Sequence, residues 1–237
     1  MADDFDAPKK AGAWGQAVAA VAVVAALGGG LWALQAQETE ASSKGEARAA
    51  TCSDGEPEKE QEKTGKGPRH VSGLQLCEAL NRPDLAELLG TPGERAKTAG
   101  GSDSSFKTGS GKEIDTPSAK IEYDTYTVNL AATYDGLKVT DSASLLRDSR
   151  QQRVLGRPGI VYSDQTISIR FRLDGSDSET GAGVPARVVS VAQDAKDSGG
   201  SFELTLWRTD GTMPDDTVLL RVAEKVLPTL PGWAAER

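Results

Sequence analysis

Residues 201–227 read SFELTLWRTDGTMPDDTVLLRVAEKVL, and two different periodicities meet within this stretch. In its first part, Phe202, Leu204 and Leu206 alternate with other residues, which predicts a half-buried strand. From about Asp215 to Leu227, apolar residues recur every three or four positions, which predicts a helix with one buried face. A strand pattern followed directly by an amphipathic helix is typical of an α+β domain.

The predicted C-terminal helix carries its own start and stop signals. Pro214, Asp215 and Asp216 suit a first helical turn, and Pro228 ends the helix. Its apolar side chains fall on one face, which we expect to be buried: Val218, Leu219, Val222, Ala223 and Val226.

Further strands are predicted upstream of this stretch. Residues 128–134 alternate in polarity, and Asp135-Gly136 follows as a turn. Residues 167–173, ISIRFRL, show the strongest alternation in the chain. Another strand contains Val189 and Val191, and the polar sequence DAKDSGG (194–200) joins it to the strand at 202–206 as a hairpin. We expect the C-terminal helix to pack against Ile169, Phe171 or their neighbours.

Helices are also predicted before these strands. Residues 74–90, LQLCEALNRPDLAELLG, have helical spacing, and Pro83 divides them into two short helices with Asn81 as the cap of the second. Residues 91–117 are rich in Gly, Ser, Lys and Asp, and we interpret them as a long loop. Residues 141–154 are predicted to be helical, with Leu145 and Leu146 on the apolar side. Residues 71–237 thus form an α+β domain, a mainly antiparallel sheet with packed helices at both ends.

The N-terminal part of the chain carries a membrane-anchor signal. Residues 11–37 contain no charged side chain, and the run is long enough for the roughly 20 residues that cross a bilayer. Trp14 and Trp32 are spaced to lie at the two membrane interfaces. Two lysines precede the run and glutamates follow it, so the positive-inside rule places residues 1–12 in the cytoplasm. We predict a single-pass signal-anchor helix over 13–36, in the plasma membrane, with the C-terminal domain extracytoplasmic.

Two alternatives for this segment stay open. A signal peptide could be cleaved near Leu34-Gln35-Ala36, although its apolar region is longer than the 7–15 residues usual for such peptides. Ala22, Ala26 and Gly30 form a stripe of small residues that suits a weak homodimer through the membrane helix, but such spacing is common in spans rich in Ala and Gly.

A charged linker follows the anchor. Between Glu38 and His70 there is no large apolar residue, and the charges alternate in sign. A segment of this composition cannot bury enough apolar surface to offset the entropy of ordering. We predict a flexible, disordered stalk over residues 37–70.

The chain has two cysteines, Cys52 in the stalk and Cys77 in the first predicted helix. Outside the membrane, an isolated pair of cysteines is normally a disulfide. We therefore predict a Cys52–Cys77 bond that fastens the end of the stalk to this helix. A metal site formed by both cysteines, His70 and a carboxylate is the alternative, but the sequence shows no recognised spacing of metal ligands.

Several segments together resemble a known kind of protein. These are the anchor, the stalk, LCEAL…LAELLG, RPGIVYSDQTISIRFRL, GGSFELTLWRTDG and PDDTVLLRVAEKVLPTLPGW. In this order they resemble a family of uncharacterised actinobacterial membrane-anchored proteins with an extracytoplasmic domain. The LCEAL helix is also similar to helices of cell-envelope lipoproteins, although no lipid-acceptor cysteine is present. The resemblance implies no activity, cofactor or catalytic residue.

The chain offers little material for catalysis. His70 is the only histidine, and its place at the end of the stalk suits a rigidly held base poorly. Residues 108–112 resemble a phosphate loop, but Phe106 replaces the first glycine and Glu113 the Ser/Thr. Residues 181–186, GAGVPA, imitate a dinucleotide fingerprint, but we interpret them as a loop.

The charged and aromatic residues outside the helices have ordinary interpretations. The acids of two predicted turns lack calcium-binding spacing, so we interpret them as solvated: Asp174, Asp177, Glu179, Asp194 and Asp197. Trp207 lies opposite to Leu206 on its strand and marks either a contact surface or, as we favour, a second buried layer covered by helices.

These observations favour a binding protein over an enzyme. The formal net charge of −8 argues against nucleic acid as a partner, since phosphates require a basic surface. No cofactor, metal ion or catalytic residue is predicted. We expect a membrane-anchored extracytoplasmic module that binds a protein or another component of the cell envelope. A cell-surface hydrolase is the alternative, and it requires the fold to bring two carboxylates together.

Overall fold

The computed structural model describes residues 49–54, 70–170, 179–231 and 233. In this described part, eight strands form one sheet in the order β1-β2-β5-β6-β10-β9-β8-β7, and β3 and β4 form a separate hairpin. Neighbouring strands of the sheet are antiparallel except β1 and β2, which are parallel. The predicted class, α+β with a mainly antiparallel sheet, is therefore confirmed. The predicted anchor, with Trp14 and Trp32, lies outside the described residues.

The sheet is built from strands of very unequal length. Their bounds are β1 Ser53–Asp54, β2 Thr98–Ser102, β3 Ser105–Lys107, β4 Glu113–Asp115, β5 Ser118–Glu122, β6 Tyr126–Thr133, β7 Arg150–Val154, β8 Arg157–Arg170, β9 Glu179–Ala192 and β10 Ser201–Arg208. The helical segments are α2 Gly73–Leu80, α3 Leu85–Leu89, α4 Val139–Ser142, η1 Ala143–Leu145, α5 Asp216–Val226 and η2 Leu227–Thr229.

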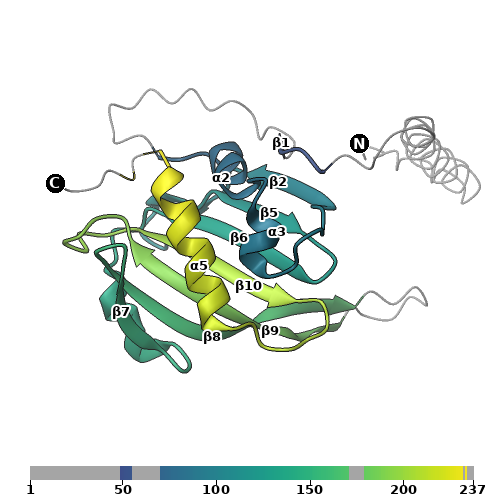
Figure 1. Cartoon of the computed structure of the whole chain (residues 1–237). Helices are drawn as coiled ribbons and strands as arrows, with labels where there is room; N and C mark the ends of the chain where they lie inside the picture. The colour runs from purple at the N-terminus through teal and green to yellow at the C-terminus, as the bar shows by residue number, and fades with distance from the viewer. Residues whose placement is uncertain (1–48, 55–69, 171–178, 232, 234–237) are drawn as a thin grey trace, which may run out of the picture. The chain divides into compact units, whose positions relative to one another are not determined.

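One face of the sheet carries the main hydrophobic core. Figure 1 shows α2, α3 and α5 on this face, with α5 crossing β10 and β9. Alternate residues of the central strands point toward these helices, and Leu130, Val189 and Leu204 form one fully buried row across three strands. Burial of these alternating residues confirms the strands predicted at 128–134, 189–191 and 202–206.

The C-terminal helix forms as predicted. The Asp215 side chain accepts a hydrogen bond from the Thr217 amide at 2.6 Å, and the helix buries Leu219, Val222, Ala223 and Val226. It packs against β9, β10 and α3. The prediction that it packs against Ile169 or Phe171 concerns side chains outside the described ones.

The region of α2 and α3 differs from its prediction in one detail. Two helices do occur on either side of Pro83, but Asp84 is the residue at the N-terminal cap of α3, and Asn81 ends α2 instead of capping α3. The Asn81 side-chain amide donates to the Ala50 carbonyl at 2.8 Å, so a partner distant in sequence determines its role. Gly90 ends α3 in the left-handed conformation, as its position in the sequence suggests.

Residues 91–117 do not form a long loop, and this prediction was wrong. They contain β2, β3 and β4. The strand signal is missing in β2 because its backbone lies directly beneath α2. A Cβ atom on Gly101 would come within 2.2 Å of the Gly73 carbonyl oxygen, so only glycine permits this contact.

Residues 141–154 are not a continuous helix, so this prediction was wrong too. The chain forms α4 and η1, and it then enters the edge strand β7. Leu145 is 85% exposed, whereas Val139 packs with Ile160, Tyr162 and Val188 in a small second core. This second core lies on the face of the sheet opposite to α5, because its strand residues alternate with those of the main core.

Residues 181–186 belong to strand β9, so the prediction that they form a loop was wrong. Residues 181–185 pair with the outer part of β8, from Gln165 onward, in a two-stranded arm that extends past the neighbouring strands, whereas Ala186 pairs with Asp164 and with Trp207 of β10. A Cβ atom on Gly183 would come within 2.2 Å of the Thr166 hydroxyl oxygen, which explains the glycine at this irregular position. Ile167 is 76% exposed on the arm.

Candidate functional site

Cys52 and Cys77 are joined by a disulfide, with their Cα atoms 5.9 Å apart. The predicted bond is confirmed, and it consumes both cysteines, so the alternative metal site loses its sulfur ligands. Cys77 is fully buried in α2, and Cys52 is half-buried directly before β1. Within the described ranges, no group of three His, Cys, Asp or Glu side chains could hold a metal ion.

His70 is held more firmly than its sequence position suggests. Its ring stacks on Tyr134 with centroids 3.6 Å apart, and its Nδ1 lies 2.7 Å from an Asp115 carboxylate oxygen. The Tyr134 hydroxyl in turn accepts a hydrogen bond from the Val71 amide at 2.9 Å. These contacts correct the expectation of a poorly held histidine, and they were missed because its partners are 45 or more residues away. The cluster fixes the start of the domain on Asp115 of β4 and on Tyr134, directly after β6.

The motif-like segments have structural roles. Residues 108–112 form the turn of the β3–β4 hairpin, in which the Thr108 amide donates to the Lys112 carbonyl and the Gly111 amide to the Thr108 carbonyl. In the turn between β9 and β10, the Asp194 side chain accepts hydrogen bonds from the amides of Lys196 and Ser198. Asp174 and Asp177 lie outside the described residues, and Glu179 begins β9.

Asp197 does not fit the prediction of a solvated acid. It is 4% exposed and adopts a φ of 53°, and its carboxylate accepts hydrogen bonds from the amides of Val139 and Thr140 and from the Thr140 hydroxyl. This side chain caps α4 from a residue almost 60 positions further along the chain. No local pattern in the sequence announces such a contact.

Asp216 is more than a first-turn residue of the C-terminal helix. Its carboxylate pairs with Arg187, whose Nε lies 2.6 Å away, and with Arg150 on the edge strand. Arg187 also donates to the Ser163 hydroxyl at 2.6 Å. The helix start is therefore connected to β7, β8 and β9 through one carboxylate.

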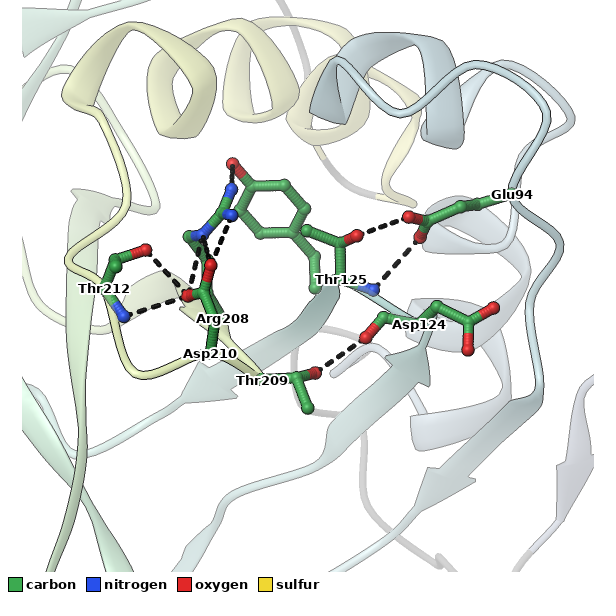
Figure 2. A network of polar contacts seen from close by, with 8 residues as sticks. Glu94, Asp124, Thr125, Arg208, Thr209, Asp210 and Thr212 are labelled. Atoms are coloured by element: carbon green, nitrogen blue, oxygen red, sulfur yellow. Dashed lines mark hydrogen bonds and ion pairs between the residues drawn. The ribbon is translucent and has the colours of Figure 1, made fainter.

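A second polar network stabilises the end of the sheet nearest α3, shown in Figure 2. The Glu94 carboxylate accepts from the Thr125 amide and hydroxyl, and the Arg208 guanidinium pairs with Asp210 and donates to the Tyr126 hydroxyl. The hydrogen bonds from Arg208, followed by those from Thr212, hold the pKa of Asp210 well below its usual range. These groups satisfy one another, so we assign the network to the architecture of the turns.

Trp207 lies half-buried on the face of the sheet opposite to the main core. The register places five residues in one row across five strands: Glu122, Thr127, Trp207, Ala186 and Asp164. The next row contains Lys120, Asn129 and Thr205. We call the part of this face on β5, β6 and β10 the polar face; it comprises Lys120, Glu122, Thr127, Asn129, Glu203, Thr205 and Trp207. Thr127 is buried, Lys120 is exposed, and the other residues of the polar face are half-buried.

The favoured prediction for Trp207 was a layer of helices over it. The helical cover on this side of the sheet is α4 with η1, and it packs against β8 and β9. Trp207 is on β10 and is absent from the second core that this cover buries. In its own row Trp207 lies between Thr127 and Ala186, and the next row contains Asn129 and Thr205.

Glu203 and Tyr162 form a hydrogen-bonded pair on this side of the sheet, and the pKa of each group is raised. The Tyr162 hydroxyl, on a 7% exposed residue, donates to a Glu203 carboxylate oxygen at 2.7 Å. Burial raises the pKa of Glu203, the bond from Tyr162 opposes this shift, and the negative charge of Asp164 adds to it. Burial beside Glu203 also raises the pKa of Tyr162. The sequence could not reveal this pair, because the two residues lie on strands separated by β9.

The spacing of these acids matters for the alternative function. Glu122 and Asp164 are four strands apart in their row, about 19 Å between backbones. Glu203 and Asp164 are two strands apart and displaced by four residues, roughly 16 Å between backbones. Glycosidase carboxyl groups are separated by about 5–9.5 Å. The sheet itself thus holds these acids further apart than a catalytic pair, and side chains alone would have to close the gap.

Comparisons with known proteins give a family and no activity. The model of a family of unknown function (DUF6215) matches residues 8–149, which is more than half of the chain. No curated protein and no solved structure matches the chain.

Proposed function

We propose that this chain, which belongs to a family of unknown function (DUF6215), is a non-enzymatic, membrane-anchored, extracytoplasmic binding module. The observation that carries the proposal is the half-buried Trp207 on the polar face, with Thr127 beside it on β6 and Thr205 on its own strand. Partly exposed tryptophans are enriched among residues that dominate binding energy, and here hydrogen-bonding neighbours can add specificity. The partner is a protein or another component of the cell envelope.

The disulfide supports the compartment in this proposal. Disulfides persist in oxidising compartments and are rare in the cytosol. The finer assignments rest on the sequence alone: a single-pass helix over 13–36 with the N-terminus inside, a stalk over 37–70, a domain over 71–237 and an actinobacterial source. In the part of the chain that the structure describes, no helix is long and apolar enough to cross a bilayer.

The topology is tested with protease added to intact spheroplasts. We expect the C-terminal domain to be degraded while a cytoplasmic marker protein survives, because the domain lies outside the membrane. Full protection of the domain, in cells where a known surface protein is digested, contradicts the assignment.

The binding role is tested by sedimenting the full-length protein, in detergent micelles, with insoluble cell-wall material and separately with immobilised envelope proteins. Replacing Trp207 with Ala should weaken binding by about 30-fold or more, the loss typical of a hot-spot residue. Phe106→Ala is the matched control, since Phe106 is 48% exposed on the separate β3–β4 hairpin. Equal binding by the Trp207→Ala and wild-type proteins contradicts the proposed surface.

The alternative, a cell-surface hydrolase, retains one observation in its favour. The pKa of Glu203 is raised, as a general acid requires, and Asp164 is the acid whose charge contributes to that rise. The backbone spacing of the two residues disfavours it. Glu203→Gln tests the hydrolase, because it should abolish any polysaccharide cleavage, and a wild-type protein that cleaves no cell-wall polysaccharide contradicts this alternative.

A further inference from the structure

Residues 49–54, which we call the edge segment, lie on the domain although they precede it by a long stretch of sequence. Ser53 and Asp54 pair in parallel with Gly100 and Gly101 of β2 at the edge of the sheet. The Ala50 amide donates to the Ala96 carbonyl at 3.1 Å, and the Asn81 side chain donates to the Ala50 carbonyl at 2.8 Å. The Cys52–Cys77 disulfide is the covalent link between this segment and α2.

The non-covalent contacts of the edge segment are weak by comparison. The segment pairs with β2 through only two residues, which is shorter than an ordinary strand, and Thr51 and Ser53 are exposed. The segment supplies only Ala50 and Cys52 to the margin of the main core.

The contacts that position α2 on the sheet do not involve the edge segment. Leu76 and Leu80 are fully buried, and the helix backbone contacts β2 at Gly73 and Gly101. We therefore expect α2 and the core to stay in place when the edge segment leaves β2.

We propose that the Cys52–Cys77 disulfide is a redox latch that holds the edge segment on β2. A dithiol reductant opens it by exchange. One thiolate attacks the sulfur of the half-buried Cys52, and Cys77 leaves as a thiolate that takes a proton. The second thiol of the reductant then closes its own disulfide and frees Cys52 as a thiol. The protein gains two thiols and the reductant loses two, so atoms and electrons balance.

Opening the latch has two structural consequences. The outer edge of β2 loses its partner and becomes an unpaired strand edge, which can accept another strand. The point at which the N-terminal part of the chain joins the domain also moves from residue 49 to residue 70. This adds about 20 residues of chain, which reach at most about 70 Å when extended. With the anchoring under Proposed function, on which this second consequence rests, the redox state controls how far the domain stands from the membrane.

The experiment places a site for a specific protease within residues 59–65 of the full-length chain and a purification tag at the C-terminus. After cleavage, the C-terminal fragment is captured under oxidising conditions and again with a dithiol, and the N-terminal fragment recovered with it is measured. We expect complete recovery under oxidising conditions. With the dithiol, recovery should fall about tenfold or more, since the covalent link supplies the effective concentration that keeps the segment in place.

The control is the Cys52→Ser/Cys77→Ser double variant with the same protease site, which should lose the N-terminal fragment without a reductant. The thermal transition of the captured fragment should stay cooperative after reduction, because the core does not depend on the edge segment. Full recovery of the N-terminal fragment in the presence of dithiol overturns the proposal, as does unfolding of the domain on reduction. Whether the uncut chain sediments with membranes is read separately and tests only the anchoring.

Discussion

Asp197 shows how one side chain can serve a helix that its own sequence neighbourhood does not contain. The residue is buried in the turn between β9 and β10, and its carboxylate accepts three hydrogen bonds from Val139 and Thr140. A helix of four residues has unsatisfied amides in its first turn, and a carboxylate placed there also interacts favourably with the helix dipole. The turn and α4 are therefore stabilised together.

Replacing Asp197 with Ala should lower the free energy of unfolding by about 1–3 kcal/mol, because two amides and a hydroxyl lose a buried acceptor. Chemical denaturation at neutral pH measures this change. Asp197→Asn is the matched control. Asn tolerates the positive φ of 53° and keeps one acceptor oxygen, so the free energy of unfolding should fall less in this variant. Equal losses in the two variants would contradict this expectation, because Asn carries no conformational penalty at this φ and its retained acceptor oxygen would then contribute nothing.

Because Glu203 is half-buried, we expect it to make the stability of the folded protein depend on pH in an unusual direction. Burial raises its folded-state pKa above the unfolded value of about 4.3. The folded protein then binds the proton more tightly than the unfolded chain does. This contribution to stability is fully present below the unfolded pKa and is lost as pH rises through the folded pKa. We expect Glu203→Gln to flatten this fall and to be more stable than the wild type at pH 8, as measured by denaturation across pH 4–8.

Glu122 supplies the opposite control on the same face. The hydrogen bond from Lys120 lowers the pKa of Glu122 in the folded protein. The contribution of Glu122 to the stability of the folded state is therefore present above the unfolded pKa and is lost as pH falls through the folded pKa. Glu122→Gln should therefore weaken the protein slightly at neutral pH. The same direction of change in both variants would show that the two carboxylates do not have opposite environments.

Among the elements, α5 connects several parts of the domain that are distant in sequence. Its first turn pairs with arginines of β7 and β9 through Asp216, and its apolar face lies over β9, β10 and α3. The helix end continues into η2, after which Trp233 packs beside Phe202 with ring centroids 5.8 Å apart. Arg157 lies over the Trp233 ring at 3.6 Å. The C-terminal part of the domain is thus fastened to the sheet at both ends.

Replacing Leu219 with Ala should cost about 2–5 kcal/mol of stability, because its fully buried side chain leaves a cavity between α5 and the sheet. Thermal or urea denaturation measures the loss. The control is Leu145→Ala, in which the same group is removed from an 85% exposed site and the change should stay within about 0.5 kcal/mol. Similar effects at both positions would contradict the assigned burial of the α5 face.

At the scale of the whole molecule, the disulfide affects stability through both the unfolded chain and the folded state. Closing a loop of 25 residues in the unfolded chain stabilises the folded state by about 3–3.5 kcal/mol, if the native contacts stay the same without the bond. If the edge segment leaves β2 when the bond is absent, the folded state gains chain entropy as well. The net loss of stability is then smaller than the loop-closure value.

We therefore expect the Cys52→Ser/Cys77→Ser variant to be less stable than the wild type by under about 3 kcal/mol, as measured by urea denaturation with both proteins in the same buffer. Hydrogen exchange should show lost protection in residues 98–102 and unchanged protection in β6 and β10. A loss of the full loop-closure value, with β2 still protected, would show that the segment stays docked without the bond.

The sequence by itself determined the features that depend on local periodicity or on a unique choice of partner. The apolar spacing in 216–226 and 126–133 marks a buried face whatever packs against it, so the C-terminal helix and the central strand were predictable. The disulfide was predictable because the chain has only two cysteines. Trp207 stood out because its strand alternates cleanly, which placed it on the face opposite to Leu206.

The tertiary structure decided the rest, because those features depend on distant partners. Strand β2 has no apolar alternation, since Gly101 is required by the close approach of α2, and the largely polar β7 becomes a strand by pairing with β8 at the edge of the sheet. Asn81, Asp197 and Glu203 acquire their roles from residues 31 or more positions away. A hydrogen bond between such partners exists only when the chain is folded, and a pattern of neighbouring residues carries no trace of it.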